Sequence, residues 1–565
     1  MKTLICDCNR TQPLNGPALK QALSKTPGAQ TDGLDTVHSL LCRREAGAFQ
    51  RAAKSGDDLL VACTQESALF LDLNDATEGA PPVTERPIRF VNLRETGGWS
   101  KDAQRAPSSL TPKWAALIAA AQLPDPAPVA TVTYRSAGRL LIIGDADAAE
   151  RAAAMVADKL NVSLLLPRSG GALSQTRRHA VHTGSLTRLA GWLGQFEAEW
   201  QSSNPIDADL CTRCNACVEA CPEGAIDFSY QVDLELCKGH RRCVQVCEAA
   251  GAIDFQRAPQ TAEGRYDQVL DLRDAPAYNM HQPPQGYFHV PAGRDERRLM
   301  DAVLQLREMV GEFDKPKFFD YKQKLCAHSR NEQIGCTACI EVCSTRAIRS
   351  NASSKGISKT KIAQGQAGGG IIVEPHLCVG CGACTTVCPS GALAYATPGT
   401  VDMGRRLRTL LGAYQQAGGR DAALLFHSQT AGTALIDELG RAARTDPTVQ
   451  GVPARVLPVA VWHTASVGLD LWLSALAMGA SQVWVLMTDA EAPEYRQALT
   501  DQMAVAQAIL SGLGWTGQHL RLLQVRDARD LAQLDADLRA APAPGVRQPL
   551  ALAPQADKRA TLDMA

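Results

Sequence analysis

Apolar runs and helical segments alternate in the last third of the chain. Four short apolar runs have the length of buried strands: 422–426, 454–462, 482–487 and 520–525. Three segments between them have helical apolar spacing: those near 431–443, 470–478 and 494–512. Strands that alternate with helices are typical of a parallel sheet, so residues 420–540 are predicted to form a parallel α/β domain. The proline-containing stretch 541–565 is predicted to be a flexible tail.

The beginning of the chain shows a similar alternation. A short opening strand, a strand at 59–63 and a helix at 111–121 follow one another. Thr111 and Pro112 suit the first turn of that helix, because threonine caps helices and proline fits their first turn. Residues 1–125 are therefore predicted to form an α/β domain.

A βαβ unit follows, and its domain is interrupted by an insert. The predicted elements are a strand at 139–144, a helix at 146–160, and strands at 163–166 and 266–272. Because the last strand lies far beyond the first three elements, segments 130–204 and 258–315 are assigned to one domain with an insert at 205–257.

The insert and a later segment carry cysteine motifs. Two runs have the spacing C-x2-C-x2-C-x3-C-P: Cys211, Cys214, Cys217, Cys221 with Pro222, and Cys378, Cys381, Cys384, Cys388 with Pro389. This is the bacterial ferredoxin spacing, in which three thiolates hold one iron–sulfur cube and the fourth reaches a neighbouring cube. Such a run strongly indicates an iron–sulfur cluster.

Each regular run has a less regular companion. The companions are Cys237, His240, Cys243 and Cys247 in the insert, and Cys326, Cys336, Cys339 and Cys343 in the later segment. All four runs are followed by similar residues: Gly224-Ala-Ile, Gly251-Ala-Ile, Arg346-Ala-Ile and Gly391-Ala-Leu. This fourfold repeat predicts two α+β dicluster ferredoxin-like domains, at 205–257 and 320–397.

The pairing of motifs in dicluster ferredoxins implies crossed ligation. In the first unit, Cys247 is expected to join Cys211, Cys214 and Cys217, and Cys221 is expected to join Cys237 and Cys243. In the second unit, Cys343 is expected to join Cys378, Cys381 and Cys384, and Cys388 is expected to join Cys336 and Cys339. Cys326 is either a further ligand, reached by a nine-residue loop, or a free buried thiol.

His240 stands where the second thiolate of its motif is expected. A neutral imidazole can bind iron and would raise the cluster's potential, as histidine does in Rieske centres. The alternative is a solvated histidine among Lys238, Arg241 and Arg242, with a 3Fe-4S cluster or none. Because both two-residue gaps around His240 are kept, ligation is favoured.

Composition narrows the function classes. The chain has 565 residues, with 58 Lys and Arg against 59 Asp and Glu, so no basic surface indicates nucleic acid. Of the 19 cysteines, 15 lie in the four motifs, which favours a reducing, cytoplasmic compartment. The first residues lack the apolar core of a signal peptide. The apolar window 471–488 is interrupted by polar residues, so no membrane span is expected.

The N-terminal domain resembles that of the heterodisulfide reductase A subunit. The resemblance rests on Cys6-x-Cys8, Ser39-Leu-Leu-Cys42, Leu60-Val-Ala-Cys63-Thr64 and Val91-Asn-Leu-Arg-Glu95 with Trp99. Spacing alone leaves Cys42 and Cys63 open as buried apolar residues. The resemblance implies a cluster on Cys6, Cys8, Cys42 and Cys63.

The same family has a flavin-binding βαβ unit where this chain has Gly144-Asp-Ala-Asp-Ala-Ala-Glu150. Of the expected glycines only Gly144 is present, and Asp145 and Asp147 stand where a pyrophosphate approaches backbone amides. The middle domain is therefore predicted to be a degenerate Rossmann-like domain that does not bind FAD.

The C-terminal domain is similar to the delta subunit of methyl-viologen-reducing hydrogenase, most clearly at 473–480. That relative carries cysteines for a small cluster, whereas this domain has none. As a whole, the chain resembles iron–sulfur proteins encoded beside formate dehydrogenases, which implies a redox protein partner, such as formate dehydrogenase.

These patterns lead to one main hypothesis and two alternatives. The main hypothesis is a soluble electron-transfer component with four or five 4Fe-4S clusters, rather than an enzyme in its own right. The first alternative is a flavin-containing, heterodisulfide-reductase-like oxidoreductase. The second is a maturation or assembly factor for a molybdenum-type oxidoreductase.

Overall fold

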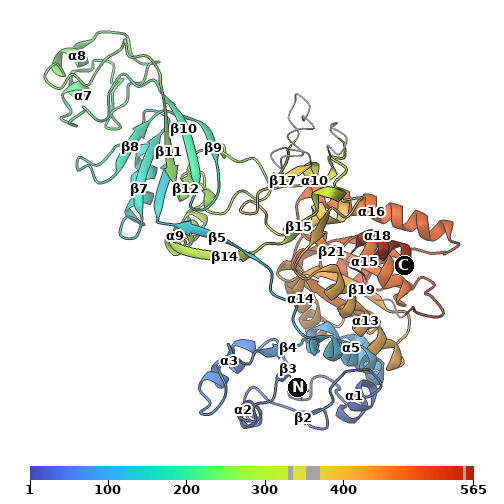
Figure 1. The fold of residues 1–565 in the computed structure, drawn as a ribbon. Helices are drawn as coiled ribbons and strands as arrows, with labels where there is room; N and C mark the ends of the chain where they lie inside the picture. The colour runs from blue at the N-terminus through green and yellow to red at the C-terminus, as the bar shows by residue number, and fades with distance from the viewer. Residues whose placement is uncertain (329–334, 352–369, 551–554, 556) are drawn as a thin grey trace.

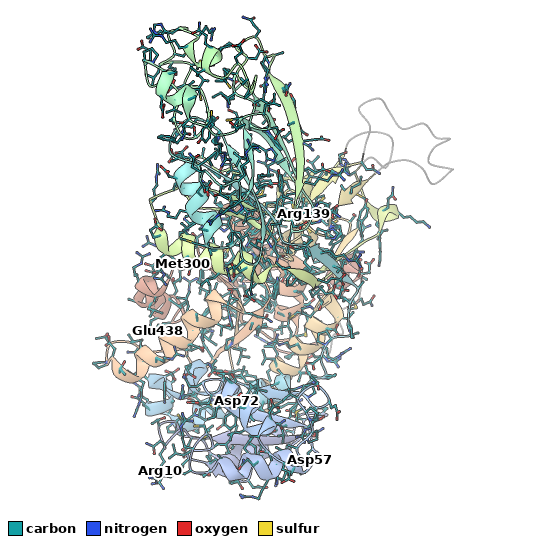
Figure 2. All side chains as sticks on the ribbon, turned by 90° about the vertical axis from the view of Figure 1, so that its left-hand side faces the viewer. Arg10, Asp57, Asp72, Arg139, Met300 and Glu438 are labelled. Atoms are coloured by element: carbon teal, nitrogen blue, oxygen red, sulfur yellow. The ribbon has the colours of Figure 1, made fainter. Side chains whose placement is uncertain are left out.

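The computed structural model describes residues 1–328, 335–351, 370–550, 555 and 557–565. It is a mixed α/β structure with several parallel sheets. In both Figure 1 and Figure 2 the insert at 205–257 lies at the opposite end of the molecule from the N-terminal domain. Within the described residues, no helix is long and apolar enough to cross a membrane.

The N-terminal domain is built on a parallel sheet in the order β2-β1-β3-β4. The strands are β1 (Lys2–Cys6), β2 (Val37–His38), β3 (Leu59–Ala62) and β4 (Ile88–Phe90). The helices are α1 (Gly16–Leu23), α2 (Ala46–Lys54), α3 (Ser67–Asp75), α4 (Lys101–Arg105) and α5 (Thr111–Ala121). All four residues of β3 are buried, as expected for a strand covered on both faces. The predicted strand at 59–63 and helix at 111–121 are confirmed.

The middle domain has a five-stranded parallel sheet in the order β8-β7-β6-β12-β13. Its strands are β6 (Arg139–Ile143), β7 (Asn161–Leu166), β8 (Ala180–Thr183), β12 (Gln268–Asp271) and β13 (Tyr287–His289). Counted along the chain, this is the order 3-2-1-4-5 of doubly wound dinucleotide-binding folds. The helix expected at 146–160 is shorter, α6 (Ala146–Ala154), and turns follow it.

Different layers cover the two faces of this sheet. Helices α6 and α9 (Glu296–Glu308) share an apolar core with one face, to which Leu299, Val303 and Leu306 contribute. The other face packs against an antiparallel sheet of β9 (Ser185–Ala190), β10 (Phe196–Ser202) and β11 (Gln260–Tyr266). The middle domain is thus a three-layer unit.

Asp267 explains why the predicted strand at 266–272 is divided between two sheets. Its carboxylate accepts hydrogen bonds from the backbone of Ala137 and Arg139, both at 2.9 Å, and forms an ion pair with the Arg139 guanidinium at 2.7 Å. The chain leaves the antiparallel sheet at Tyr266 and joins the parallel sheet at Gln268. Arg139 is labelled in Figure 2, near the middle of the molecule.

The first ferredoxin unit emerges between β10 and β11, which pair with each other along their length. Single bridges join Ile206 to Ile253 and Ile226 to Val232. The unit contains two short helices, α7 (Ala216–Ala220) and α8 (Arg242–Val246), which pack together. β5 (Thr131–Ser136) and β14 (Gly311–Pro316) pair antiparallel, so the chain enters and leaves the middle domain side by side.

The second ferredoxin unit has two antiparallel strand pairs, β15–β18 and β16–β17. Its elements are β15 (Phe319–Tyr321), a 3₁₀ turn at Gln323–Leu325, α10 (Ala338–Glu341), β16 (Ile348–Ser350), β17 (Ile371–Val373), α12 (Ala383–Val387) and β18 (Leu393–Tyr395). It contacts the middle domain through His376, whose ring stacks on Trp192 at a centroid distance of 4.8 Å.

The C-terminal domain has a parallel sheet in the order β20-β19-β21-β22. The strands are β19 (Ala423–Ser428), β20 (Val456–Val461), β21 (Gln482–Met487) and β22 (Leu520–Gln524), and they confirm the four predicted strands. Three helices agree with the prediction: α14 (Ala431–Thr445), α15 (Leu469–Ala477) and α16 (Pro493–Gly512). Helix α13 (Thr400–Gln416) was not predicted, and α17 (Leu531–Asp537) follows the last strand.

Part of the segment expected to be a flexible tail lies against the second ferredoxin unit. Helix α18 (Lys558–Met564) packs beside α15. The Lys558 ammonium donates hydrogen bonds to the backbone carbonyls of Thr385, Thr386 and Cys388 at 2.7–3.2 Å. The end of the described chain therefore contacts a cysteine motif.

The N-terminal and C-terminal domains share one apolar core, in which α5 packs against α13. Lys113, completely buried on α5, donates a hydrogen bond to the Pro453 carbonyl at 3.0 Å. A Cβ atom on Gly440 would lie 2.4 Å from the Glu95 carbonyl oxygen, so only glycine allows α14 to approach this closely. Sites in the N-terminal domain are thus held against the C-terminal sheet.

Candidate metal centres

Two sets of candidate ligands lie in the first ferredoxin unit, each around its own small cavity. Set A consists of Cys211, Cys214, Cys217 and Cys247, which line a cavity of about 10 Å³. Set B consists of Cys221, Cys237, His240 and Cys243, which line a cavity of about 20 Å³. Each set takes one cysteine from the other motif, because α7 and α8 pack side by side and carry the end of each motif to the opposite cavity. This is the crossed arrangement that the motif spacing predicts.

Three of the four motifs have a two-residue gap on each side of their second ligand position, and these three loops share one backbone conformation. Residues on either side of the second ligand position have positive φ: Arg213 and Asn215 around Cys214, Gly239 and Arg241 around His240, and Gly380 and Gly382 around Cys381. Arg213, Asn215 and Arg241 adopt this left-handed conformation although it is costly for residues other than glycine. The His240 loop therefore keeps the geometry of a ligand loop.

His240 itself makes a polar contact at the edge of set B. Its Nε2 lies 3.0 Å from the Glu223 carboxylate, and its side chain is 47% exposed. Glu223 lines the same cavity as His240. The backbone places His240 at the ligand position, while its ring contacts a carboxylate that an iron atom would have to replace.

We predict that His240→Cys retains a four-iron cluster in set B and lowers its reduction potential. A thiolate adds one negative charge compared with imidazole, and the Rieske centres indicate a change on the order of 100 mV for such an exchange. EPR-monitored redox titration of the anaerobic protein measures it. Cys214→His, the reverse exchange at the same position of the regular motif, is the matched control and should raise the potential of set A. A three-iron cluster in the parent protein, completed only by His240→Cys, would contradict ligation by His240.

Set C, in the second ferredoxin unit, places Cys326 beside three other candidate ligands. Cys326, Cys336, Cys339 and Cys388 line a cavity of about 20 Å³. Cys326 is 9% exposed. The Tyr321 hydroxyl forms a hydrogen bond with its thiol. Residues 329–334 of the long loop lie outside the described residues, but both of its ends reach the same cavity.

Set D consists of Cys343, Cys378, Cys381 and Cys384, which are all partly buried. Burial raises the pKa of the Cys384 thiol, and the nearby thiols of Cys381, Cys378 and Cys343 raise it further. The Tyr495 hydroxyl, from α16, forms hydrogen bonds with the thiol of Cys381 and the hydroxyl of Ser344. Set D therefore lies where the second ferredoxin unit packs on the C-terminal domain.

The N-terminal set surrounds a larger cavity. Cys6, Cys8, Cys42 and Cys63 line a cavity of about 90 Å³ at the ends of β1 and β3. Burial raises the pKa of the Cys6 thiol to about 11. A cluster binds thiolates, so assembly at this set must displace a firmly held proton. The structure brings together the four cysteines that the resemblance indicates.

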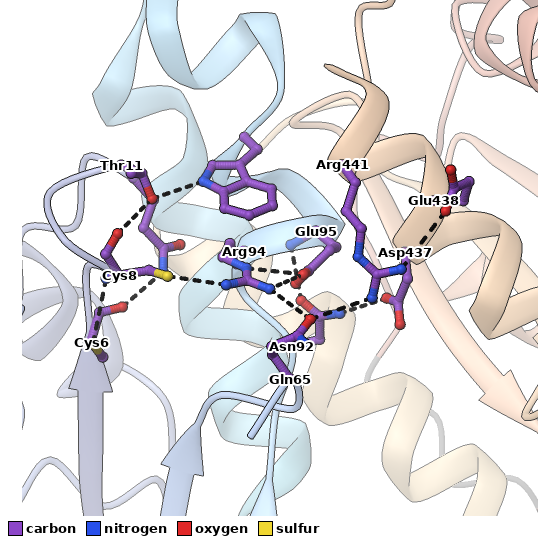
Figure 3. A network of polar contacts seen from close by, with 12 residues as sticks. Cys6, Cys8, Thr11, Gln65, Asn92, Arg94, Glu95, Asp437, Glu438 and Arg441 are labelled. Carbon is purple, nitrogen blue, oxygen red and sulfur yellow. Dashed lines mark hydrogen bonds and ion pairs between the residues drawn. The ribbon is translucent and has the colours of Figure 1, made fainter. Parts of the chain in front are cut away.

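Arg94 connects this set to the C-terminal domain, as Figure 3 shows. Its guanidinium donates a hydrogen bond to the Cys8 sulfur at 3.0 Å and another to the Gln65 side chain at 3.1 Å. It also pairs with the buried Glu95 carboxylate, and Arg441 of α14 bonds Gln65 from the other side at 3.4 Å. Hydrogen bonds to a ligand sulfur help to set the potential of a cluster.

The donor sets fit iron–sulfur clusters better than single metal ions. Among the described residues, no three His, Cys, Asp or Glu side chains converge closely enough to hold one ion. A cube needs four ligands spread around its corners, and each of the four sets around a cavity offers sulfur or imidazole donors on its wall. The sets would hold clusters of this type and supply one-electron chemistry when loaded.

The flavin site of the middle domain does not fit a pyrophosphate. Asp145, at the N-terminus of α6, forms two 2.9 Å bonds with Arg168, and Asp147 accepts a hydrogen bond from the Ala172 backbone at 2.9 Å. Two carboxylates thus lie at the start of α6, where they would repel the negative charge of a pyrophosphate. These contacts support the prediction that FAD does not bind.

Several residues beside the candidate ligands could not be found from the sequence. Arg94, Tyr495, Lys315 and Lys558 each contact a cysteine sulfur or a cysteine backbone carbonyl. Arg94 lies in the segment 91–95 that carries the family resemblance. The other three residues belong to no motif, because each lies far along the chain from the cysteine that it contacts.

Matches to known proteins identify the class. Residues 334–392 match the family described as 4Fe-4S dicluster domain, and residues 205–227 match the 4Fe-4S binding domain. Pyruvate synthase subunit PorD of Methanothermobacter marburgensis is 39% identical over 59 residues, which cover 10% of this chain and 72% of that protein. The chain therefore belongs, through this domain, to the 4Fe-4S dicluster ferredoxin family. The first match leaves out Cys326, and the second leaves out Cys237, His240, Cys243 and Cys247. The assignment of individual ligands stays a prediction.

A second relationship extends over more of the chain. The A subunit of H(2):CoB-CoM heterodisulfide,ferredoxin reductase from Methanothermobacter thermautotrophicus is 27% identical over 182 aligned residues, covering 27% of each protein. Coenzyme F420-dependent sulfite reductase of Methanocaldococcus jannaschii is 33% identical over 61 residues, 10% of each chain. The chain thus spans about a quarter of the length of its heterodisulfide reductase relatives. It is an iron–sulfur protein with ferredoxin-type domains and a distant relationship to those reductases.

Proposed function

We propose that the protein transfers single electrons through four or five 4Fe-4S clusters and serves an oxidoreductase such as formate dehydrogenase. The observation that supports this most is the crossed pairing of sets A and B, since each of the two motifs in the first ferredoxin unit contributes to both sets. Shared ligation keeps two clusters next to each other, as electron transfer requires. The candidate ligands are Cys211, Cys214, Cys217, Cys221, Cys237, His240, Cys243, Cys247, Cys326, Cys336, Cys339, Cys343, Cys378, Cys381, Cys384, Cys388, Cys6, Cys8, Cys42 and Cys63.

The positions of the cysteine sets support a function in which the protein exchanges electrons with other proteins. Sets A and B lie in the unit that extends from one end of the molecule in both views (Figures 1 and 2), and Cys214 is exposed. Cys381 and Cys384 of set D pack against the apolar core of the C-terminal domain. A set with an exposed cysteine at the end of the molecule suits electron exchange with a partner, while set D lies beside the C-terminal domain.

Reduction by a dehydrogenase tests this function. We predict that catalytic amounts of formate dehydrogenase with formate bleach the visible absorption of the anaerobically purified protein, that reoxidation restores it, and that iron content does not change. The matched control omits formate, and dithionite defines full reduction.

Two other outcomes lead to different conclusions. If dithionite reduces the clusters but the dehydrogenase does not, formate dehydrogenase is not the partner. If iron leaves the protein and appears on a cluster-free dehydrogenase, the maturation alternative replaces electron transfer.

A further inference from the structure

A cavity lies between the N-terminal and C-terminal domains, and it is separate from the cavities that the cysteine sets surround. Its volume is about 580 Å³, a size common for sites of small organic ligands. One wall comes from β4 and α5, and the other comes from α13, α14 and the strands β19 and β20. It therefore opens beside the carboxyl end of β19, the side of a parallel sheet where α/β proteins bind ligands.

The cations of this cavity differ in their partners. Arg89 pairs with Asp125 at 3.1 Å, and Arg405 pairs with Asp402 at 3.3 Å. Arg406, the next residue on α13, is half-buried and donates one hydrogen bond, to the Ala460 carbonyl at 3.0 Å. No carboxylate of the described residues pairs with Arg406. Burial lowers the pKa of its guanidinium, and no nearby acid offsets this effect.

Two further polar groups face the same cavity. His427 is only 5% exposed, its Nδ1 contacts the Ser428 carbonyl at 3.1 Å, and no described residue bonds its Nε2. Asp437 accepts a hydrogen bond from Asn92 at 2.8 Å, and burial raises the pKa of its carboxyl to about 6. The remaining wall is largely apolar and includes Met403 and Val459.

We propose that this cavity binds a small organic anion, a carboxylate or a phosphate monoester, whose charged group pairs with Arg406. A guanidinium without a counter-ion in a partly apolar site can donate a bidentate, charge-assisted pair of hydrogen bonds to such a group. The apolar wall accommodates the body of the ligand, and the Nε2 of His427 provides a further polar contact. Asp437 carries negative charge when ionised, which favours an uncharged or donating group at its end of the cavity.

The position of the cavity links it to the N-terminal set. Asn92 lines both this cavity and the cavity of Cys6, Cys8, Cys42 and Cys63, and the Asn92–Asp437 bond is drawn in Figure 3. A bound anion would therefore lie one side chain away from the N-terminal set.

Binding of four matched probes to the holoprotein tests the site. Benzoate and phenyl phosphate carry the two candidate anionic groups on the same apolar body, whereas benzyl alcohol and benzylamine replace them by a neutral or a cationic group. By equilibrium dialysis and thermal unfolding, we expect at least one anion to bind at one equivalent per chain and raise the melting temperature. We expect neither the alcohol nor the amine to do so. If benzoate binds more tightly, the site is a carboxylate site, and if phenyl phosphate binds more tightly, it is a phosphate site.

Variants of adjacent arginines assign the binding to Arg406. Arg406→Gln should lower the affinity for the anion by about tenfold or more, which is the scale of one charge-assisted hydrogen bond. Arg406→Lys should lower this affinity less. Arg405→Gln, on the same helix turn but paired with Asp402, is the matched control and should leave affinity unchanged. Cluster absorption shows whether each variant has folded. The proposal is overturned if neither anion binds, if benzyl alcohol binds equally well, or if Arg406→Gln and Arg406→Lys both bind like the parent protein.

Discussion

Replacing Cys247 by alanine should remove the cluster of Cys211, Cys214 and Cys217, although Cys247 lies in the other motif of the unit. Cys247 lines the cavity of set A, and it does not line the cavity of set B. We expect iron content to fall by about four atoms per chain, the content of one cube. Iron analysis and EPR spectroscopy of the anaerobic protein measure the loss.

The reciprocal variant serves as the control. Cys221→Ala takes the ligand of the first motif that lies in set B, so it should abolish the set B signal and leave the set A signal intact. Loss of the set B signal in Cys247→Ala, with set A preserved, would show that each motif binds its own cluster and that the crossed assignment is wrong.

Replacing Lys113 by methionine should change how stability depends on pH. Complete burial lowers the pKa of the Lys113 ammonium from 10.5 to about 7, so the unfolded chain binds the proton more strongly than the folded protein does. Folding therefore costs free energy wherever the unfolded lysine is charged, and this cost decreases as pH rises from 7 towards 10.5. Between neutral pH and two units above it, the parent should gain about 2–3 kcal/mol relative to Lys113→Met.

The comparison is best made by urea unfolding at both pH values. Methionine keeps most of the side-chain volume but leaves the Pro453 carbonyl without its donor, which lowers stability equally at each pH. Lys101→Met is the matched control, since Lys101 donates to the Ala443 carbonyl across the same domain interface at 2.8 Å but is only half-buried. A difference between parent and Lys113→Met that does not vary with pH would mean that Lys113 is protonated in the folded protein.

Local patterns predicted the C-terminal sheet well. The strands near 422–426 and 482–487 are short, apolar and buried on both faces. A run of this kind can be predicted as a strand from its own residues, because it is apolar along its whole length. Helix α13 was not predicted, because its apolar face is completed only by contact with α5, nearly 300 residues earlier in the chain.

The sequence by itself determined which residues are candidate ligands and how the ferredoxin motifs pair, because a cluster requires sulfur donors at short fixed spacing and a proline or turn where each loop ends. Only the tertiary structure decided the surroundings: Arg94 at the Cys8 sulfur, Tyr495 at Cys381, and the cavity that Arg406 faces. The reason is physical. The conformation of a ligand loop depends on its own backbone. The burial of the cysteines, the charges near them and the hydrogen bonds to their sulfur atoms come from segments that meet only when separate domains pack.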